Sequence, residues 1–374
     1  MRIAIDALGI TLPGGGRSAT LNLLTALFKI DQENDYLLFL DRHEQTLIAR
    51  NVRQYITGIE GRFAARLWAQ LALPTLLRRE RVAVVHYAKN LGAFFTPGAT
   101  VVTVYDLSIL ICPDVYPWSD RVYWRFIEPI TLRQAKRIIA ISEDTARDIV
   151  NFYRIPRERI VVIYPGCDPR FRPLSAEEVS KVKQKYNLPD AFILHVGSIS
   201  RKKNLVTLAR AIAKLKQAGL NPRLVLVGRI YKKARDEALF RYIQRENLSN
   251  EVIWLGAVPD QDLPAIYNCA TVLAFPSLQE GFGLVPLEAM SCGLPIITSG
   301  AGAIREVIGD AGLIVNNPMD ESEWALLVEQ VLRDSSLRAQ LRSRGLTRAR
   351  MFSNEEAARQ MLQIYRQVTG QDVQ

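Results

Sequence analysis

The stretch Glu280-Gly-Phe-Gly-Leu-Val-Pro-Leu-Glu288 lies between two apolar runs, Thr271–Ser277 and Leu294–Ser299, and each run is typical of a buried parallel strand. Pro286 suits the first turn of a helix and Gly293 suits its end, so the spacing predicts a short helix between the two strands. Strand, glycine loop, helix and strand in this order indicate an α/β fold with a parallel sheet.

A ligand site is predicted at the glycine loop before this helix. The loop and the first helical residue offer backbone N–H groups, those of Gly281, Phe282, Gly283 and Leu284. Helix N-termini bind anions such as phosphate, and Glu280 beside the loop adds an acceptor for sugar hydroxyls. Glu288, about one turn into the helix, could accept from a second pair of hydroxyls, such as those of a ribose. The alternative is that Glu288 caps its own helix and that Glu280 is a solvated loop acid.

Length and composition exclude several classes of protein. The chain has 374 residues, enough for two domains, and its 48% hydrophobic and 23% charged residues are ordinary for a globular enzyme. No apolar run reaches the roughly 18 residues of a membrane span, and Met1–Asp6 enters a strand without a signal-peptide region. The four cysteines show no C-x-x-C spacing, which argues against a zinc site and a disulfide framework. A cytoplasmic location is expected.

The net charge of +10 is concentrated in the first half of the chain. Between Arg50 and Arg137 there are 13 Lys and Arg residues against 6 Asp and Glu residues. Such a surface fits an acidic acceptor, an anionic membrane leaflet or nucleic acid, or it is a solvated face without a partner. No zinc finger, RNP sequence or basic heptad is present, so nucleic acid is not expected as a partner. The amphipathic run Arg62–Leu77 is read as a helix that either contacts a membrane or an acceptor, or packs in the ordinary way.

The first half has the pattern of a doubly wound domain. Arg2–Ala7 alternates like a strand, Gly14–Gly16 follows as a loop, and Thr20–Phe28 reads as a helix. Ligands of such domains bind beyond the carboxyl ends of the strands. The glycines do not match the G-x-G-x-x-G dinucleotide fingerprint, and they either allow close approach to a bound group or form a tight turn. Further strands are expected at residues 36–40, 82–86, 100–106, 138–142 and 160–164.

A proline-dense segment, Pro165–Pro173, separates two such patterns and is predicted to be a linker. The alternation restarts after it with Phe192–Val196. The predicted domains are residues 1–166 and 167–353, with a final helix, residues 354–374, packing back on the first domain. The fold class is therefore α/β, with two doubly wound, Rossmann-like domains facing a central cleft where two-domain enzymes bind substrates.

Four motifs follow one another along the chain between Tyr164 and Pro295. They are Tyr164–Phe171, Val196–Asn204, Leu255–Asp260, and Glu280-x7-Glu288 within Pro276–Pro295. This ordered set resembles the retaining glycosyltransferases of GT-B architecture in glycosyltransferase family 4 (glycosyl transferases group 1). Such enzymes move a hexose from a nucleoside diphosphate, of the UDP-glucose or GDP-mannose type, to a hydroxyl of a saccharide or lipid-linked saccharide. The resemblance implies no metal ion and no cofactor beyond the nucleotide-sugar substrate.

The resemblance also implies roles for single residues. Glu280 would hold the donor hexose and Glu288 the ribose. Lys203 falls on the family's Lys position and would compensate the charge of the leaving diphosphate. Ser198 stands at the family's Arg position, so Arg201 or its neighbour Lys202 would substitute, unless this basic run is a solvated loop cluster.

Other matched positions concern the base and the diphosphate. Val258 stands where the family's backbone contacts the base, and Arg229 near it is either a contact or a simple surface charge. Gly15 and Gly16 would approach the diphosphate and sugar from the first domain once the cleft closes.

One position departs from the family pattern. After the strand Val101–Val104 the family has His followed by Asp, whereas this chain has Tyr105-Asp106. A tyrosine can donate a hydrogen bond there but cannot act as a base near neutral pH. His86, at a neighbouring strand end, is either an acceptor-site residue or a structural one, and His195 is expected to be structural. Tyr105 keeps open a catalytically silent nucleotide-sugar binding protein, and a GT-B sugar-nucleotide epimerase, which would need no acceptor, is the other alternative.

Overall fold

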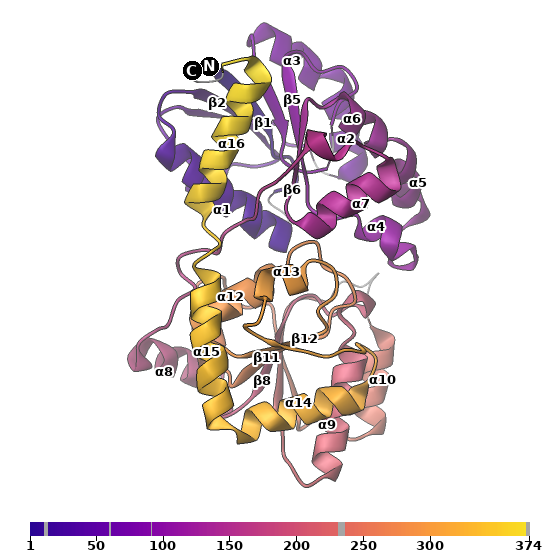
Figure 1. Cartoon of the computed structure of the whole chain (residues 1–374), viewed down its shortest axis with the longest axis vertical. Helices are drawn as coiled ribbons and strands as arrows, with labels where there is room; N and C mark the ends of the chain where they lie inside the picture. Colours follow the sequence, from indigo (N-terminus) through magenta and orange to yellow (C-terminus); the bar gives the residue numbers. More distant parts are fainter. Residues whose placement is uncertain (11–13, 60, 91, 231–235, 372–374) are drawn as a thin grey trace. The chain divides into compact units, whose positions relative to one another are not determined.

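The computed structural model describes residues 1–10, 14–59, 61–90, 92–230 and 236–371 (Figure 1). The chain divides into two compact units. Unit 1 consists of Met1–Gly166 with Phe352–Gln374, and unit 2 of Cys167–Met351. Each unit is built on one parallel sheet with helices packed against it.

The sheet of unit 1 has seven strands in the order β3-β2-β1-β4-β5-β6-β7, and all neighbours run parallel. The strands are β1 Arg2–Asp6, β2 Asp35–Leu40, β3 Val52–Ile56, β4 Val84–Tyr87, β5 Ala99–Val104, β6 Arg137–Ala140 and β7 Ile160–Val162. The central strands are short apolar runs that are almost fully buried, as expected for a sheet covered on both faces. Asp6 at the end of β1 lies opposite Tyr87 at the end of β4, so the segments after the strands gather at one edge.

Helices cover both faces of this sheet. They are α1 Gly15–Ile30, α2 Arg62–Leu71, α3 Leu73–Arg79, α4 Ser108–Ile111, α5 Trp118–Phe126, α6 Glu128–Gln134, α7 Glu143–Tyr153 and α16 Asn354–Thr369. Because side chains alternate along a strand, Ile3 and Ile5 of β1 join the core beneath α1 and α16, whereas Ala4 faces a second core with α3 and α6.

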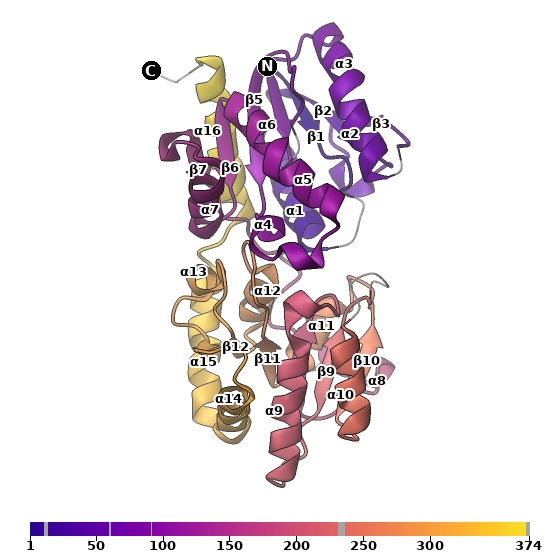
Figure 2. The same ribbon diagram turned by 90° about the vertical axis from the view of Figure 1, so that its right-hand side faces the viewer.

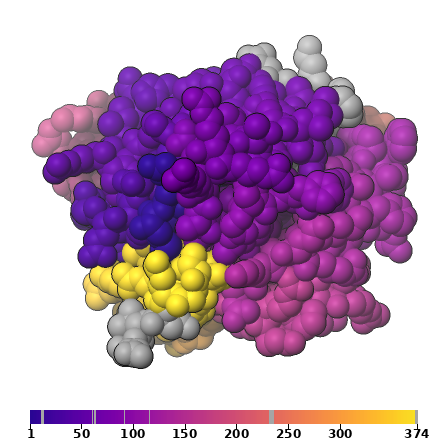
Figure 3. Space-filling view, turned by 90° about the horizontal axis from the view of Figure 1, so that it is seen from above, coloured from indigo at the N-terminus to yellow at the C-terminus, as the bar shows by residue number. Residues whose placement is uncertain are grey.

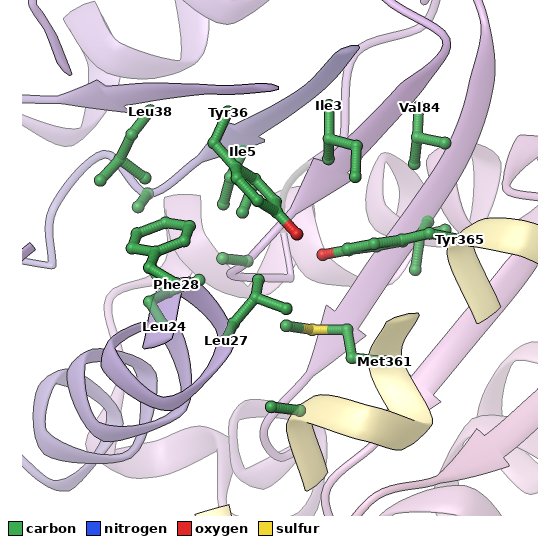
Figure 4. Packing of buried hydrophobic residues seen from close by; sticks show 14 of the residues in the cluster. Ile3, Ile5, Leu24, Leu27, Phe28, Tyr36, Leu38, Val84, Met361 and Tyr365 are labelled. Atoms are coloured by element: carbon green, nitrogen blue, oxygen red, sulfur yellow. The ribbon is translucent and has the colours of Figure 1, made fainter. Parts of the chain in front are cut away.

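The helix α16 belongs to unit 1 although the whole of unit 2 precedes it in the sequence. Its Met361 and Tyr365 lie in one apolar cluster with Ile3, Leu27 and Tyr36, and the hydroxyls of the two tyrosines point toward each other (Figure 4). In the space-filling view the yellow C-terminal segment lies against indigo N-terminal residues (Figure 3). This packing makes the C-terminal helix part of the first core.

The sheet of unit 2 has six parallel strands in the order β10-β9-β8-β11-β12-β13. They are β8 Ile193–Val196, β9 Leu224–Val227, β10 Val252–Gly256, β11 Val272–Phe275, β12 Ile296–Thr298 and β13 Leu313–Ile314. The helices are α8 Ala176–Lys185, α9 Leu205–Gln217, α10 Glu237–Arg245, α11 Leu263–Cys269, α12 Leu284–Cys292, α13 Ile304–Ile308, α14 Glu321–Arg333 and α15 Ser335–Ala349. A core that includes Trp324, which is fully buried, holds α9 and α14 against the strands.

Two parallel-sheet α/β domains are confirmed, but some local predictions are wrong. The run Arg62–Leu77 is not one helix: α2 ends at Leu71 and α3 starts at Leu73. Pro74 explains the break, because its ring clashes with the carbonyl four residues earlier and it has no N–H to donate. The strand β3 was not predicted, because as an edge strand it is half-exposed and carries Arg53 and Gln54.

Candidate functional site

The candidate site of unit 2 forms at the carboxyl edge of its sheet. The loop after β8 and the loop after β9 approach each other there through Gly197 and Gly228. A Cβ atom on Gly228, whose φ is +149°, would lie only 1.8 Å from the carbonyl oxygen of Gly197. The two backbones therefore pack at a distance that only glycine permits, and this contact fixes the loop that leads to Lys203.

An ion pair between Lys203 and Glu280 is the centre of this edge. Lys203 ends a 3-10 turn after β8, Glu280 follows β11, and the Lys203 ammonium donates a short hydrogen bond to Oε1 of Glu280. Only 14% of the Lys203 side chain and 17% of the Glu280 side chain are exposed. The ammonium also lies 4.9 Å from the centroid of the Phe275 ring, at the end of β11. Of the predicted site residues, the structure brings these two into direct contact.

The electrostatics of the pair keep Glu280 ionised. Burial alone would raise its pKa, but the charges of Lys203 and Lys202 and the hydrogen bond from Lys203 outweigh burial, so the pKa of Glu280 lies below its usual value. An ionised carboxylate only accepts hydrogen bonds. The pair thus presents an anion that can bind hydroxyls next to a cation that can bind phosphate.

The predicted short helix is confirmed as α12, which starts at Leu284 and ends where Gly293 adopts φ +73°. Gly283 precedes the helix in the left-handed conformation, with φ +104°, and Phe282 is buried. The loop therefore turns sharply into the helix, and the first helical residue, Leu284, stands four residues after Glu280.

Glu288 lies in the middle of α12 and is 7% exposed. Its Oε2 accepts a hydrogen bond of 2.7 Å from the hydroxyl of Tyr267 on α11, so the described contacts of this carboxyl do not cap its own helix. Burial raises the pKa of Glu288 to about 8; Asp168 and Asp260 add to this rise, while Tyr267 and Arg170 oppose it. At neutral pH this carboxyl is therefore largely protonated.

A pH dependence of stability follows from Glu288. Its pKa in the folded protein lies above the usual glutamate value of 4.5, so this group stabilises the fold fully at acid pH and loses that effect as pH rises to about 8. Each pKa unit corresponds to about 1.4 kcal/mol, so the rise of the Glu288 pKa sets an upper limit of about 5 kcal/mol. Glu288→Gln is expected to flatten the decline of Tm between pH 5 and pH 8. Glu329→Gln, on α14, should leave the decline as it is; equal slopes in both variants would contradict this assignment.

Other predicted residues of unit 2 lie in the loops after β8, β9 and β10. Ser198 and Ser200 lie with their hydroxyl oxygens 3.5 Å apart, and Arg201 is exposed. Val258 is half-buried in the loop after β10, and Arg229 is exposed after β9. Their predicted contacts with a diphosphate or a base stay predictions.

In unit 1 the structure joins Tyr105 to the glycine loop. The Tyr105 hydroxyl makes a short hydrogen bond with Oγ1 of Thr20. The Thr20 hydroxyl in turn donates a hydrogen bond of 2.7 Å to the carbonyl oxygen of Gly16. Gly15 and Gly16 begin α1 and are exposed, and a Cβ on either would meet no atom within 4 Å. Thr20 was not identified from the sequence, because it sits inside an ordinary helical run. Tyr105 therefore braces the first turn of α1.

The same contacts decide what Tyr105 can do. Burial raises its pKa to about 12, with Thr20 acting in the opposite direction, so the phenol stays protonated at neutral pH. Tyr105→Phe is expected to lower transfer at most about tenfold, the effect of one lost hydrogen bond, and to leave the pH profile between pH 6 and 9 unchanged. Thr20→Val removes the same bond and also the one to Gly16, so the double variant should be no worse than Thr20→Val alone. A loss of about 1,000-fold in Tyr105→Phe alone would mean that the phenol takes part in the chemistry.

Two histidines are fully internal. The Nδ1 atom of His86 lies 2.6 Å from the hydroxyl of Tyr365, and its Nε2 atom lies 2.7 Å from Oγ1 of Thr103. Both ring nitrogens are thus engaged in the core, which supports a structural role for His86. His195, in β8, is 0% exposed and its Nδ1 lies 3.1 Å from the carbonyl oxygen of Ala274. Burial lowers the pKa of each to about 3, so both rings are neutral.

The described residues contain no group of three or more His, Cys, Asp or Glu side chains that could hold a metal ion. No helix in that part of the chain is long and apolar enough to cross a membrane. The described cysteines form no disulfide.

Comparison with known proteins identifies the family. The family described as Glycosyl transferases group 1 matches residues 177–348, and Glycosyltransferase Family 4 matches residues 13–171. O-antigen chain mannosyltransferase B of Escherichia coli is 35% identical over 71% of this chain and 70% of its own length. The serotype-specific mannosyltransferase WbdA of Escherichia coli is 32% identical over 71% of this chain, which spans only 33% of WbdA.

Solved structures show the same fold. Sucrose-phosphate synthase from Thermosynechococcus elongatus superposes with a TM-score of 0.82 at 21% identity, covering 100% of both chains. The Anabaena protein Alr3699/HepE, in complex with UDP and glucose, gives a TM-score of 0.78 at 20% identity, covering 97% of this chain and 99% of that chain. The chain therefore belongs to the glycosyl transferases group 1, as a family 4-like glycosyltransferase with the GT-B fold.

Proposed function

We propose that this chain transfers a mannosyl residue, with retention of the anomeric configuration, from a nucleoside diphosphate to a hydroxyl of a saccharide or lipid-linked saccharide. The observation that carries the proposal is the buried Lys203–Glu280 pair, with α12 beginning four residues after Glu280. Mannose is chosen because two relatives above 30% identity are named mannosyltransferases. The donor is accordingly proposed to be of the GDP-mannose type, with the UDP-glucose type as its competitor.

The proposed roles follow from charge. The bond between the anomeric carbon and the diphosphate oxygen breaks as the new bond to the acceptor oxygen forms, so negative charge grows on the diphosphate. That charge would be stabilised by Lys203, by the N–H groups at the start of α12 and by the exposed side chain of Arg201. Glu280 would hold hydroxyls of the hexose, and Glu288 those of the ribose. Because Tyr105 stays protonated, the acceptor's proton is proposed to pass to the departing diphosphate oxygen, with no metal ion required.

The experiment that tests the donor site is a thermal-shift titration with GDP, UDP, ADP and dTDP, with and without magnesium. A ligand at about 100 times its Kd stabilises by about 2.7 kcal/mol. One diphosphate should raise Tm well above the others, equally with and without magnesium. Absence of any shift would overturn the proposed site.

Product analysis then separates the alternatives. Mannose transferred to an acceptor supports the proposal. An isomerised sugar nucleotide formed without an acceptor would identify an epimerase. Binding of a diphosphate without turnover of any sugar nucleotide would identify a silent binding protein.

An anionic membrane surface is part of the proposal, as a partner of unit 1. Four apolar side chains four residues apart lie exposed along α5 and α6: Trp118, Val122, Phe126 and Ile130. Trp118 is 72% and Phe126 59% exposed. The two helices run on through Ile127, which is itself in the helical conformation, so the four side chains form one stripe. An apolar stripe of this kind is typical of helices that lie in a membrane interface.

Neighbouring elements extend this surface, which we call the α5–α6 face. Figure 2 shows α2 beside α5 and α6, and Arg66 of α2 holds the helices together through Asp120 at 3.2 Å. Phe95, 76% exposed, stands at a cavity of about 370 Å³ that is also lined by Arg78 and Lys136. Cations around exposed aromatic side chains fit the phosphates of anionic lipids.

Vesicle binding tests the α5–α6 face. The protein is expected to co-sediment with vesicles containing phosphatidylglycerol and far less with pure phosphatidylcholine. Trp118→Ser with Phe126→Ser should weaken binding by at least about tenfold, since burying each side chain is worth about 1.5–3 kcal/mol. Leu326→Ser, at an equally exposed position on α14 of unit 2, is the control. Equal binding by both variants, or equal binding to both vesicles, would exclude this face.

A further inference from the structure

The imidazole of His195 has one ring nitrogen that the fold leaves without a partner. The ring is fully buried, and since a carbonyl only accepts, Nδ1 must carry the proton that is donated to Ala274. This fixes the neutral tautomer in which Nε2 is an acceptor. No described residue donates a hydrogen bond to that Nε2 atom. A buried acceptor without a donor costs free energy, so its retention calls for a role.

The unpartnered Nε2 atom faces the side chain of Lys203. A Cβ placed on Gly197 would lie 3.3 Å from Nε2 of His195 and 3.4 Å from Cε of Lys203, so both groups border the same small space. The His195 ring also lies nearly parallel to the Phe275 ring, with an interplanar angle of 17° and 5.9 Å between the ring centroids. The Lys203 ammonium lies over the same Phe275 ring. His195 and the Lys203 ammonium therefore both lie against the ring of Phe275.

The hydrogen-bonding capacity of Lys203 is not exhausted by Glu280. An ammonium has three donors, and Glu280 is the one hydrogen-bond acceptor that the described residues give it. Glu280 takes one of these donors and a bound diphosphate would take a second, so a third donor remains. The ammonium then needs a neutral acceptor that keeps its charge in place.

We propose that His195 is a positioning residue for Lys203: the Nε2 atom of His195 accepts a hydrogen bond from the third donor of the ammonium while Glu280 and a diphosphate occupy the other two. The proposal rests on the proposed donor site. His195 touches no substrate; it holds the cation that does. The neutrality of the ring suits this role, because a charged imidazole would repel the ammonium instead.

Two amide variants separate the two ring nitrogens. In His195→Gln the side-chain amide reaches the place of Nε2 and can accept there. In His195→Asn the shorter amide reaches the place of Nδ1 and can keep the bond to Ala274, but nothing replaces Nε2. The quantity to measure is the ratio of the Kd values for the nucleoside monophosphate and diphosphate of the base that stabilises the wild type. General damage to the fold weakens both ligands alike, whereas a misplaced Lys203 weakens the diphosphate selectively.

The expected result is a fall of about tenfold in this ratio for His195→Asn, with His195→Gln within about twofold of the wild type. In the Lys203→Met background, His195→Asn should change the ratio no further. A ratio unchanged in His195→Asn, or lowered more in His195→Gln, would overturn the proposal and leave a packing role. If the wild-type protein binds no nucleotide, the proposed donor site does not exist, and this result would overturn the proposed function together with this inference.

Discussion

Lys203→Met is expected to lower glycosyl transfer by about 1,000-fold or more and to destabilise unit 2 by about 3 kcal/mol. The loss of rate follows because the ammonium contacts Glu280, four residues before α12 begins, and is the cation proposed to bind the diphosphate. The loss of stability follows because Glu280, 17% exposed, is left as a buried carboxylate without its counter-ion. Transfer assays and urea unfolding measure the two effects separately.

A pH comparison and a double variant test the cause of the instability. In the wild type the pKa of Glu280 is lowered, so the pair stabilises the fold above the ordinary carboxylate pKa and loses that effect as pH falls. The defect of Lys203→Met should therefore be larger at pH 7 than at pH 4, where the stranded carboxyl takes up a proton. Adding Glu280→Gln should restore stability but not transfer. A double variant as unstable as Lys203→Met would show that the pair does not act through charge.

The fold was readable from the sequence where periodicity was strong. Buried strands such as Ile193–Val196 are continuous apolar runs, and glycine and proline mark the ends of α12. Edge strand β3 was missed because exposed side chains weaken its pattern. Helix α8 was also missed, although Ser175 and Glu178 form a capping box that is visible in the sequence. These misses concern local signals that compete with tertiary packing.

The candidate site was readable only in part. Glu280, Glu288 and Lys203 stand in motifs, so the sequence alone identified them. The residues that contact them do not stand in motifs. Phe275 lies next to Lys203 because β11 pairs with β8, and Tyr267 reaches Glu288 because α11 packs on α12. Partners of this kind are set by register and helix packing, and no pattern along the chain encodes them.

The contact between Tyr105 and Thr20 shows the same limit. The two residues are 85 positions apart, and the hydrogen bond between their side chains joins the end of β5 to the second turn of α1. The sequence marked Tyr105 as a departure from the family, but it could not show that the hydroxyl turns toward the glycine loop.

Gly228→Ala is expected to lower the stability of unit 2 more than the addition of a methyl group at any other glycine of that unit. The new Cβ would stand 1.8 Å from the carbonyl oxygen and 2.6 Å from the carbonyl carbon of Gly197, and backbone atoms cannot rotate away as a side chain can. The chain would have to part β8 from β9 at their carboxyl ends. We expect a loss of stability above about 4 kcal/mol, seen as a fall in Tm.

The same change should also abolish the donor site. Gly197 borders both Lys203 and His195, so moving it displaces the cation that is proposed to bind the diphosphate. Stabilisation by the preferred nucleoside diphosphate should therefore disappear in whatever folded protein remains. Gly256→Ala is the matched control: Gly256 ends β10 with φ +71°, and its Cβ would meet nothing within 4 Å. It should cost only about 1–2 kcal/mol of backbone strain and keep the nucleotide shift. Equal stability of the two variants would mean that the carboxyl ends of β8 and β9 do not meet through these glycines, and the geometry proposed for Lys203 would fall with that contact.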